Sequence, residues 1–142
     1  MKTAFITGVT AGIGEACTRT FVADGWRVIG TGRRVERLKA LAEELGDAFT
    51  PIALDMRDRA AVIECAKGLP PIDLLVNNAG YATAAVPLHE AELDPIVAMI
   101  ETNVVGLVVL TKTLLPNLIA TKGAIIDLSS VAASYPYRGG AN

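Results

Sequence analysis

The sequence predicts an α/β protein in which helices cover both faces of a doubly wound parallel sheet. Three observations lead to this fold class. Short apolar runs rich in β-branched residues alternate with longer amphipathic patterns along the chain. A glycine-rich segment, TGVTAGIG, joins the first run to the first helical pattern. The 142 residues contain no repeat, linker or low-complexity segment, which fits one domain built from right-handed βαβ units.

Five short segments are predicted as strands: residues 2–7, 27–31, 49–54, 73–76 and 124–128. The last of these reads AIIDL and is expected to be buried on both faces, as strands of parallel sheets usually are. In a sheet that ended there, it would be an unpaired apolar edge. Ligands of such sheets bind beyond the carboxyl ends of the strands.

Helical patterns fill the intervals between these strands. One extends from Ile13 toward Gly25, and another over residues 35–45 places its apolar side chains on one face before Gly46. Asp58 is expected to cap a third helix that ends near Gly68. We therefore expect helix and strand to alternate up to the fourth strand.

A longer helix is expected after the fourth strand. Asp94 would cap it, Pro95 would occupy its first helical position, and it would run toward Pro116. Its apolar region, 96–119, is interrupted by charged and amide side chains such as Glu101 and Lys112. This pattern favours a buried helix over a membrane span.

Composition narrows the class of protein. The hydrophobic fraction is 51% and the mean hydropathy is +0.42, values typical of a compact protein. A net charge of −2 and a pI near 5.4 argue against nucleic acid as a partner. The two cysteines, Cys17 and Cys65, are too far apart for a CxxC metal or redox pair, so no metal site is expected. The amino-terminal apolar run is too short for a signal peptide, and a cytoplasmic location is predicted.

The glycine-rich segment indicates a phosphate-binding turn. Gly8, Gly12 and Gly14 would let the backbone turn sharply and approach a pyrophosphate at the start of the first helix. An ordinary strand-to-helix turn is the alternative for an isolated glycine triplet. A P-loop is excluded, because Glu15 follows Gly14 where that motif requires lysine.

The segment TGRRVERL after the second strand favours NADP as the cofactor. NAD-binding proteins usually carry an acidic residue near this strand end, but Gly32 occupies that place and Arg33 and Arg34 follow. Guanidinium groups make charge-assisted hydrogen bonds to a 2′-phosphate. A solvated basic turn remains the alternative for either arginine alone.

Polar residues also follow the remaining strands. Asp55 could accept a hydrogen bond from an adenine amino group or begin a turn. Asn103 lies in an apolar helix, where it is either a satisfied core amide or part of a functional water network. Ser130 could bond a substrate oxygen or cap a turn. The segment after the fourth strand would border a cofactor with two amides and two small residues: Asn77, Asn78, Ala79 and Gly80.

In this order, TGVTAGIG, GRR, LD, NNAG, TNVVG and DLSSVAA resemble the classical short-chain dehydrogenase/reductase family, and the resemblance covers the whole chain. Within that family, TGRRVERL and PYRGGAN are most similar to bacterial NADP-dependent 3-hydroxy acid dehydrogenases, which oxidise serine and allo-threonine. The resemblance implies a Rossmann-type sheet, a small hydroxy or keto substrate and a homotetramer. A membrane or nucleic-acid partner is not implied.

The resemblance also implies roles for individual residues. Asn103 corresponds to an asparagine that holds a proton-relay water, and Ser130 to the catalytic serine that positions the reacting oxygen. The cofactor would be bound by thirteen residues of the matching segments: Gly8, Thr10, Gly12, Ile13, Gly14, Arg33, Arg34, Asp55, Met56, Asn77, Asn78, Ala79 and Gly80. Two departures are Asp127, where the family commonly has Asn, and Ala133, where it commonly has Gly.

The general-base tyrosine of the family, and the lysine four residues after it, are not in residues 1–142. Tyr135 and Tyr137 are too close to Ser130, and the family spacing puts the tyrosine directly after Asn142. We therefore expect an incomplete domain that is inactive by itself and belongs to an NADP-dependent alcohol–carbonyl oxidoreductase. The alternative is a non-enzymatic NADP-binding module or sensor.

Overall fold

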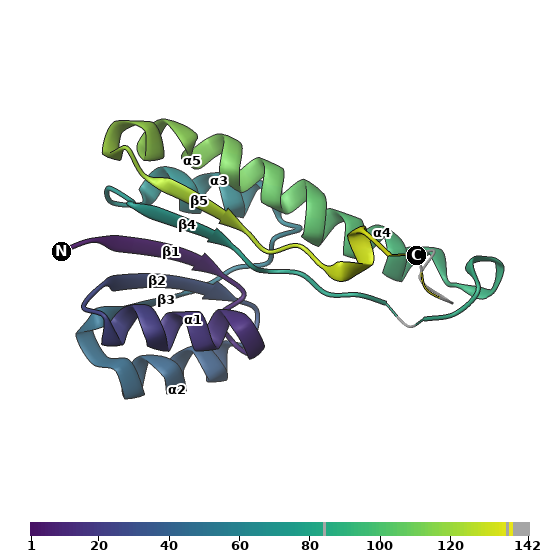
Figure 1. Ribbon diagram of the computed structural model, residues 1–142, viewed down its shortest axis with the longest axis horizontal. Helices are drawn as coiled ribbons and strands as arrows, with labels where there is room; N and C mark the ends of the chain where they lie inside the picture. Colours follow the sequence, from purple (N-terminus) through teal and green to yellow (C-terminus); the bar gives the residue numbers. More distant parts are fainter. Residues whose placement is uncertain (84, 136, 138–142) are drawn as a thin grey trace.

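The computed structural model describes residues 1–83, 85–135 and 137. In this part of the chain, five parallel strands form one sheet in the order β3-β2-β1-β4-β5 (Figure 1). The strand order reverses beside β1, which confirms the doubly wound sheet and puts the topological switch point between β1 and β4. The strands are β1 (Thr3–Thr7), β2 (Arg27–Gly32), β3 (Phe49–Ala53), β4 (Leu74–Asn77) and β5 (Ala124–Asp127).

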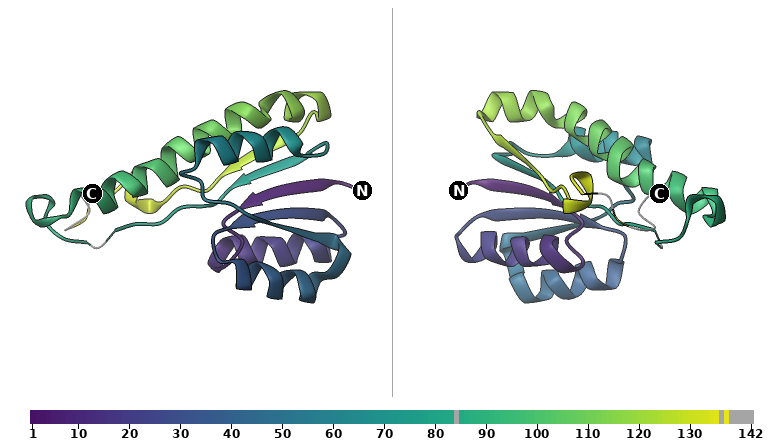
Figure 2. Two further views of the ribbon diagram at one scale, coloured as in Figure 1. Left: turned by 180° about the vertical axis from the view of Figure 1, so that it is seen from behind. Right: turned by 45° about the vertical axis from the view of Figure 1, so that its right-hand side comes forward.

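Helices lie on both faces of the sheet (Figure 2). α1 (Gly12–Ala23) and α2 (Val35–Leu45) cover one face, and α3 (Arg59–Gly68) and α5 (Leu107–Thr121) cover the other (Figure 1). A π-helical stretch, η3 (Glu101–Gly106), joins α5 to α4 (Leu93–Ile100) in one long rod. The short 3₁₀ turns are η1 (Gly46–Ala48), η2 (Leu88–Glu90) and η4 (Val131–Ala133).

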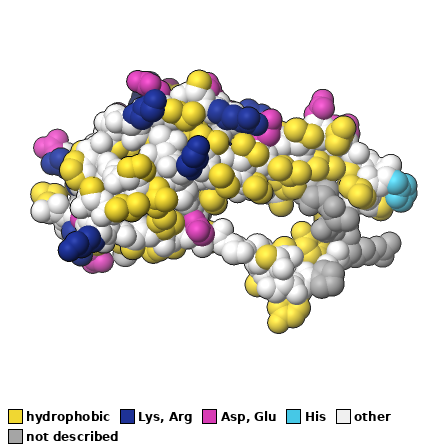
Figure 3. Space-filling model, turned by 90° about the horizontal axis from the view of Figure 1, so that it is seen from above, with side chains coloured by type: hydrophobic (Ala, Val, Ile, Leu, Met, Phe, Trp, Pro, Cys, Tyr) yellow, Lys and Arg dark blue, Asp and Glu magenta, His cyan; other side chains and the backbone are white. Residues whose placement is uncertain are grey.

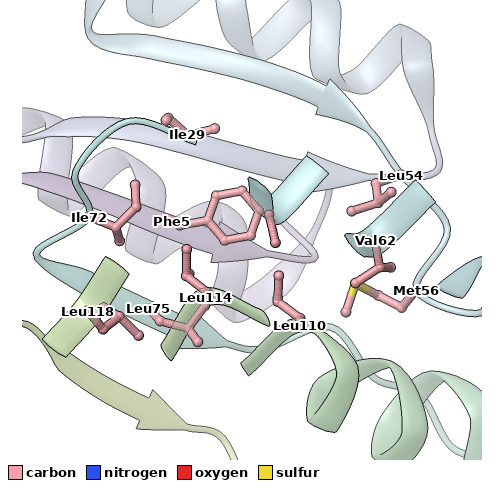
Figure 4. Close-up of a cluster of buried hydrophobic side chains, with 11 residues drawn as sticks. Phe5, Ile29, Leu54, Met56, Val62, Ile72, Leu75, Leu110, Leu114 and Leu118 are labelled. Carbon is pink, nitrogen blue, oxygen red and sulfur yellow. The ribbon is translucent and has the colours of Figure 1, made fainter. Parts of the chain in front are cut away.

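Each face of the sheet has its own hydrophobic core, because successive side chains of a strand point to opposite faces. Phe5 of β1 joins Leu75 and the α5 leucine Leu114 in the first core (Figure 4). Its neighbours Ala4 and Ile6 belong to the second core, under α1 and α2. The central strands β1 and β4 are therefore buried on both faces.

Two helix starts differ in how well the sequence predicted them. The Asp58 carboxylate accepts a hydrogen bond from the Ala61 N–H at 3.0 Å, so the predicted cap of α3 is confirmed. The predicted start of α4, with Asp94 as the cap and Pro95 as the first helical residue, is wrong, since α4 begins at Leu93 and Glu92 precedes it without a side-chain cap. An acidic residue in the first turn favours the helix dipole as well, so sequence alone does not separate the two positions.

Pro116 lies inside α5, not at the end of the helix. A proline in a helix removes one backbone hydrogen bond, and here side-chain bonds tie the following turn to the loop before β4. Asn117 accepts from the Ile72 N–H at 2.9 Å and donates to the Pro70 carbonyl at 2.9 Å. The Thr121 hydroxyl donates to the Ile72 carbonyl at 2.6 Å. These tertiary contacts therefore stabilise the part of α5 that follows Pro116.

The long rod of α4, η3 and α5 is only partly buried, which corrects the expectation of a buried helix. Leu110, Leu114 and Leu118 lie at four-residue spacing and face the sheet. The rest of the rod has an exposed apolar surface, over which hydrophobic side chains gather in Figure 3. By length and composition alone, Leu93–Thr121 is apolar enough to cross a membrane, with a mean hydropathy of 1.8 and 17% of the window buried.

β5 is also more exposed than predicted. All four of its residues are solvent-accessible, and Ile126 is 46% exposed. β5 pairs with β4 along one side and forms the edge of the described sheet. β5 is exposed because none of the described helices packs extensively against it.

Candidate cofactor site

A cleft of about 1170 Å³ opens at the carboxyl ends of the strands, beside the switch point of the sheet. It is lined by twelve of the thirteen predicted cofactor residues and by both predicted catalytic residues, Asn103 and Ser130. Gly14 is the one predicted residue that does not line the cleft. Segments that are far apart in the sequence thus meet in one concave site, the usual location for a ligand in such sheets.

The glycine turn is shaped by contacts with the segment that follows β4. Gly8 has φ +74° and Gly12 has φ +59°, a left-handed conformation that favours glycine. A Cβ on Gly8 would lie 2.9 Å from the Cα of Ala79. Gly14 lies behind the turn, where a Cβ would overlap the Gly8 carbonyl and the Asn78 amide. These close approaches leave no room for side chains at Gly8 and Gly14.

Thr7 and Asn78 connect the ends of β1 and β4. The buried Thr7 hydroxyl accepts hydrogen bonds from the Asn78 N–H at 3.0 Å and the Ala79 N–H at 2.9 Å. In return, the Asn78 side-chain amide donates to the carbonyls of Thr7 at 2.8 Å and Gly8 at 3.1 Å. The glycine turn and the NNAG segment are therefore held together as one rigid wall of the cleft.

The start of α1 fits a bound anion. No side chain caps this helix, because Ala11 stands at the capping position. Gly12 and Ile13 line the cleft, and the Ile13 side chain is 63% exposed there. Uncapped N–H groups and the helix dipole give this end partial positive charge, which suits a pyrophosphate.

Arginines from the β2–α2 junction and from the first turn of α2 reach back to the glycine turn. The Arg34 Nε donates to the Thr10 hydroxyl at 3.0 Å, and the Arg37 Nη1 donates to the Thr10 carbonyl at 3.2 Å. The Arg33 guanidinium lies over the ring of Tyr81, 5.9 Å from its centroid. Arg33 and Arg34 are exposed at the rim of the cleft, where they can meet a phosphate.

Asp55 is held by a neighbouring arginine. The Arg57 guanidinium donates to both carboxylate oxygens of Asp55, with the shortest distance 2.6 Å from Nη2 to Oδ2. The Arg57 N–H donates to the same carboxylate at 3.0 Å. These hydrogen bonds hold the pKa of Asp55 below its ordinary value. The carboxylate stays ionised and fixed, and it can still accept a hydrogen bond from a ligand amino group.

Asn103 lies in the π-helical stretch η3, and its side-chain amide binds one neighbour. Its Nδ2 donates to the Tyr81 carbonyl at 2.7 Å, and its Oδ1 accepts from the Tyr81 N–H at 3.0 Å. This reciprocal pair pins the chain after Gly80 to the long rod. The side chain of Asn103 is therefore a satisfied amide in this structure, and π-helical turns of this kind frequently lie at functional sites.

Ser130 follows β5 at the mouth of the cleft. Its hydroxyl accepts a hydrogen bond from the Ala132 N–H at 3.2 Å and so caps the turn η4. No acceptor for the hydroxyl proton is found among the described residues, so the proton can be donated to a substrate oxygen. Tyr137 also lines the cleft. The position expected for the general-base tyrosine lies outside the described residues.

The two residues that depart from the family pattern, Asp127 and Ala133, differ in what they contact and in backbone conformation. The Asp127 carboxylate accepts from the Asn77 amide at 2.7 Å, and the same amide donates to the Thr111 hydroxyl at 3.0 Å. The Asn77 Oδ1 is buried without a partner among the described residues. Ala133 does not have a positive φ, since Lys122 is the one non-glycine residue that does in the described part of the chain.

Sequence reasoning did not single out Thr7, Arg57 or Tyr81. For Thr7 a signal exists, because a polar residue at the end of an apolar strand needs a hydrogen-bond partner. Arg57 stands two residues after Asp55, but so short a spacing is common in solvated turns. No sequence signal points to Tyr81, because it binds Asn103 through its backbone N–H and carbonyl. Nearly every residue has these two groups.

Comparisons with known proteins agree with this geometry. A family model for short chain dehydrogenase matches residues 2–142. The chain is 51% identical to serine 3-dehydrogenase of Agrobacterium fabrum (strain C58 / ATCC 33970), over 97% of the chain and 57% of that protein. It is 47% identical to NADP-dependent 3-hydroxy acid dehydrogenase YdfG of Escherichia coli (strain K12), over 95% of the chain and 56% of that protein. The chain thus spans little more than half the length of these relatives.

Solved structures of dehydrogenases also resemble this chain over nearly its whole length. The closed form of a serine dehydrogenase complexed with NADP+ superposes with a TM-score of 0.93 at 46% identity, covering 97% of this chain and 58% of that one. The serine dehydrogenase from Escherichia coli superposes with a TM-score of 0.92 at 46% identity, covering 97% of this chain and 66% of that one. The fold of this chain therefore has close counterparts among solved dehydrogenase structures.

Proposed function

Because the chain belongs to the short-chain dehydrogenase family, we propose that the protein is an NADP-dependent oxidoreductase that interconverts an alcohol and a carbonyl by hydride transfer. The observation that carries the proposal is the cleft at the switch point of the sheet. There the glycine turn, the uncapped start of α1 and the arginines after β2 face one cavity. NADP supplies the hydride acceptor, or in its reduced form the hydride donor.

The residues of the cleft fit the parts of this cofactor. The close packing at Gly8 and Gly14 fixes the turn, and the open position of Gly12 at the start of α1 suits a pyrophosphate. Arg33 and Arg34 suit a 2′-phosphate, and neither is neutralised by a carboxylate in the ion pairs of the described chain.

Other cofactor contacts are proposed from the residues around the base and ribose. The fixed carboxylate of Asp55 suits the adenine amino group, with Met56 beside it. The remaining contacts would come from Thr10 and Ile13 on one side and from the NNAG segment on the other: Asn77, Asn78, Ala79 and Gly80. In support, the E. coli relative is named as NADP-dependent, and one of the similar solved structures is a complex with NADP+.

Ser130 is the proposed catalytic serine. It would donate a hydrogen bond to the reacting oxygen of the substrate and so orient it. Asn103 is the proposed holder of the relay water. Its side chain is engaged with Tyr81, so we propose that it acts by fixing the backbone of η3.

We propose that the general base lies beyond residue 142. Of the tyrosines near Ser130, Tyr135 and Tyr137 have Gly139 and Ala141 four residues later, so neither carries the lysine that lowers the pKa of a catalytic tyrosine. General-base catalysis contributes roughly 10²–10⁴ in rate. Residues 1–142 by themselves are therefore proposed to be inactive and to form an incomplete dinucleotide-binding domain.

The proposed substrate is a small hydroxy acid or the matching keto acid, with serine or allo-threonine as candidates. Support comes from the names of the relatives, which mention serine and 3-hydroxy acids. We propose a cytoplasmic homo-oligomer, a tetramer in the family pattern, because the exposed apolar surface of α4, η3 and α5 suits a second copy. The free thiols of Cys17 and Cys65 fit a reducing compartment.

The first experiment is the intact mass of the protein from its natural source, compared with 14.9 kDa for residues 1–142. The protein at that natural length is then assayed for NADP+ reduction with hydroxy acids and for NADPH oxidation with keto acids. We expect turnover, and we expect Ser130→Ala to lower kcat by roughly 10²–10⁴ while the Kd for NADP+ changes little. NADP+ binding without turnover would favour the non-enzymatic module. A protein that binds no NADP+ would refute both.

A further inference from the structure

Thr10 lies directly against the end of β2. Its side chain is buried, with 7% of the residue exposed. A Cβ built on Gly32 would lie 2.5 Å from the Thr10 Cγ2 methyl group, 3.3 Å from its hydroxyl and 3.5 Å from its Cβ. Cβ atoms essentially never approach another heavy atom closer than 3.0 Å. The 3.3 Å contact with the hydroxyl is tight but can be relieved by a shift of a few tenths of an ångström, and 3.5 Å is an ordinary van der Waals contact. The methyl group of Thr10 is therefore the atom that excludes a side chain at position 32.

Two arginines hold Thr10 in this position. Arg34 donates to its hydroxyl at 3.0 Å, and Arg37 donates to its carbonyl at 3.2 Å. Threonine has few allowed rotamers, because its Cβ is branched. A rotation that moved the methyl group away from Gly32 would also move the hydroxyl away from Arg34. The threonine cannot yield without losing a hydrogen bond.

Position 32 is where sheets of this kind that bind NAD carry an acidic residue on the ribose 2′-hydroxyl. We infer that Thr10 is a specificity-determining residue, because its methyl group bars an acidic side chain from position 32 and leaves that strand end to the 2′-phosphate of NADP. The inference rests on the proposed NADP dependence. It adds that discrimination against NAD depends on residue 10 as well as on the arginines, since specificity includes what a site excludes.

Four proteins of natural length test this inference: wild type, Gly32→Asp, Thr10→Ser and the double variant. Serine keeps the hydroxyl that Arg34 binds and removes only the methyl group. Isothermal titration gives the Kd for NADP+ and for NAD+, and thermal unfolding without nucleotide gives the stability of each protein. Gly68→Asp is the matched control, because a Cβ on Gly68 meets no atom within 4 Å.

With Thr10 in place, we expect Gly32→Asp to lower Tm by several degrees more than Gly68→Asp does and to weaken NADP+ binding at least about tenfold without a gain for NAD+. In the Thr10→Ser protein, Gly32→Asp should lower Tm much less. The double variant should also bind NAD+ about tenfold more tightly than the Gly32→Asp single variant does. Such a difference between the proteins that keep Thr10 and those that carry Thr10→Ser is expected if the methyl group of Thr10 sterically excludes a side chain at position 32.

Equal effects of Gly32→Asp in the two backgrounds, on Tm or on NAD+ binding, would overturn the inference and leave the proposed function intact. A gain of NAD+ binding by Gly32→Asp with Thr10 still present would overturn it as well. If the wild-type protein bound neither nucleotide, the proposed function would fail together with the specificity role of Thr10. The two failures are thus distinguished by the wild-type titration.

Discussion

Gly14 is a residue that the close packing of the cleft walls requires. It does not line the cavity, yet a side chain there would overlap the Gly8 carbonyl and the Asn78 amide. These two groups are hydrogen-bonded to each other at 3.1 Å, so any shift would break the connection between β1 and β4. The glycine is required by packing against a distant segment, not by its own backbone angles, since its φ is not positive.

We therefore predict that Gly14→Ala destabilises the protein by about 1–3 kcal/mol and weakens NADP+ binding. Chemical denaturation measures the stability, and titration measures the binding. Gly68→Ala is the control, because it adds the same methyl group at a helical position with open space. Similar stability losses in the two variants would contradict the proposed steric cause.

The pairing of Asp55 with Arg57 makes a second prediction at this scale. The pKa of Asp55 is lowered in the folded protein from its ordinary value of 3.8, chiefly by the hydrogen bonds from Arg57. A depressed carboxyl pKa contributes stability that is present above the ordinary value and is lost as pH falls through the folded-state pKa. Both side chains are about a third exposed or more, so solvent screens the effect and keeps it small.

We predict that Arg57→Ala lowers stability at about pH 7 and that its difference from wild type shrinks as the pH falls below about 4. Urea denaturation at several pH values measures this difference. Arg57→Lys keeps the charge without the paired hydrogen bonds and should lie between the two proteins. A difference that stayed constant across the pH range would contradict the assignment.

At the scale of elements, α5 is fastened to the loop before β4 by side chains beyond its internal proline. Asn117 satisfies the N–H of the fully buried Ile72 and the carbonyl of Pro70 at once. Without the amide, the Ile72 N–H would lose its partner in a partly buried place, and an unpaired buried donor costs about 1–3 kcal/mol.

We predict that Asn117→Ala lowers the free energy of unfolding by about 1–3 kcal/mol. Asn117→Asp keeps the oxygen that accepts from Ile72 and loses the donor to Pro70, so it should cost less. Denaturant unfolding of the three proteins, read by circular dichroism, compares them. An alanine variant as stable as wild type would mean that water replaces the amide without loss.

At the scale of the whole molecule, the described part of the chain exposes many apolar side chains along the rod of α4, η3 and α5. Val104 and Val108 on the long rod are each 54% exposed, and β5 forms an uncovered edge. An apolar surface of this extent favours association. The proposed homo-oligomer would bury it.

We predict that the combined change Val104→Asp and Val108→Asp lowers the oligomeric state, because two buried carboxylates at an apolar interface would lack partners. Sedimentation velocity measures the change. Val35→Asp is the control, since Val35 is 44% exposed and belongs to α2, which lies on the opposite face of the sheet from α5 (Figure 1). A wild-type protein that sediments as a monomer would refute the proposal of an oligomer.

Sequence by itself determined the alternation of strands and helices, the glycine turn and the class of cofactor that the arginines suit. These features follow from local patterns: a period of two in strands, a periodicity near 3.6 in helices, and the backbone freedom of glycine. The cap at Asp58 was predictable for the same reason, because a cap and its helix are neighbours in the chain.

Only the tertiary structure decided how these local pieces are used. Thr7 binds the backbone 71 and 72 residues later, Asn103 binds Tyr81 across 22 residues, and Thr10 lies against Gly32. It likewise decided that α5 continues past Pro116 and that β5 and much of the long rod are exposed. Such contacts depend on which distant segments the sheet brings together, and no local pattern contains that information.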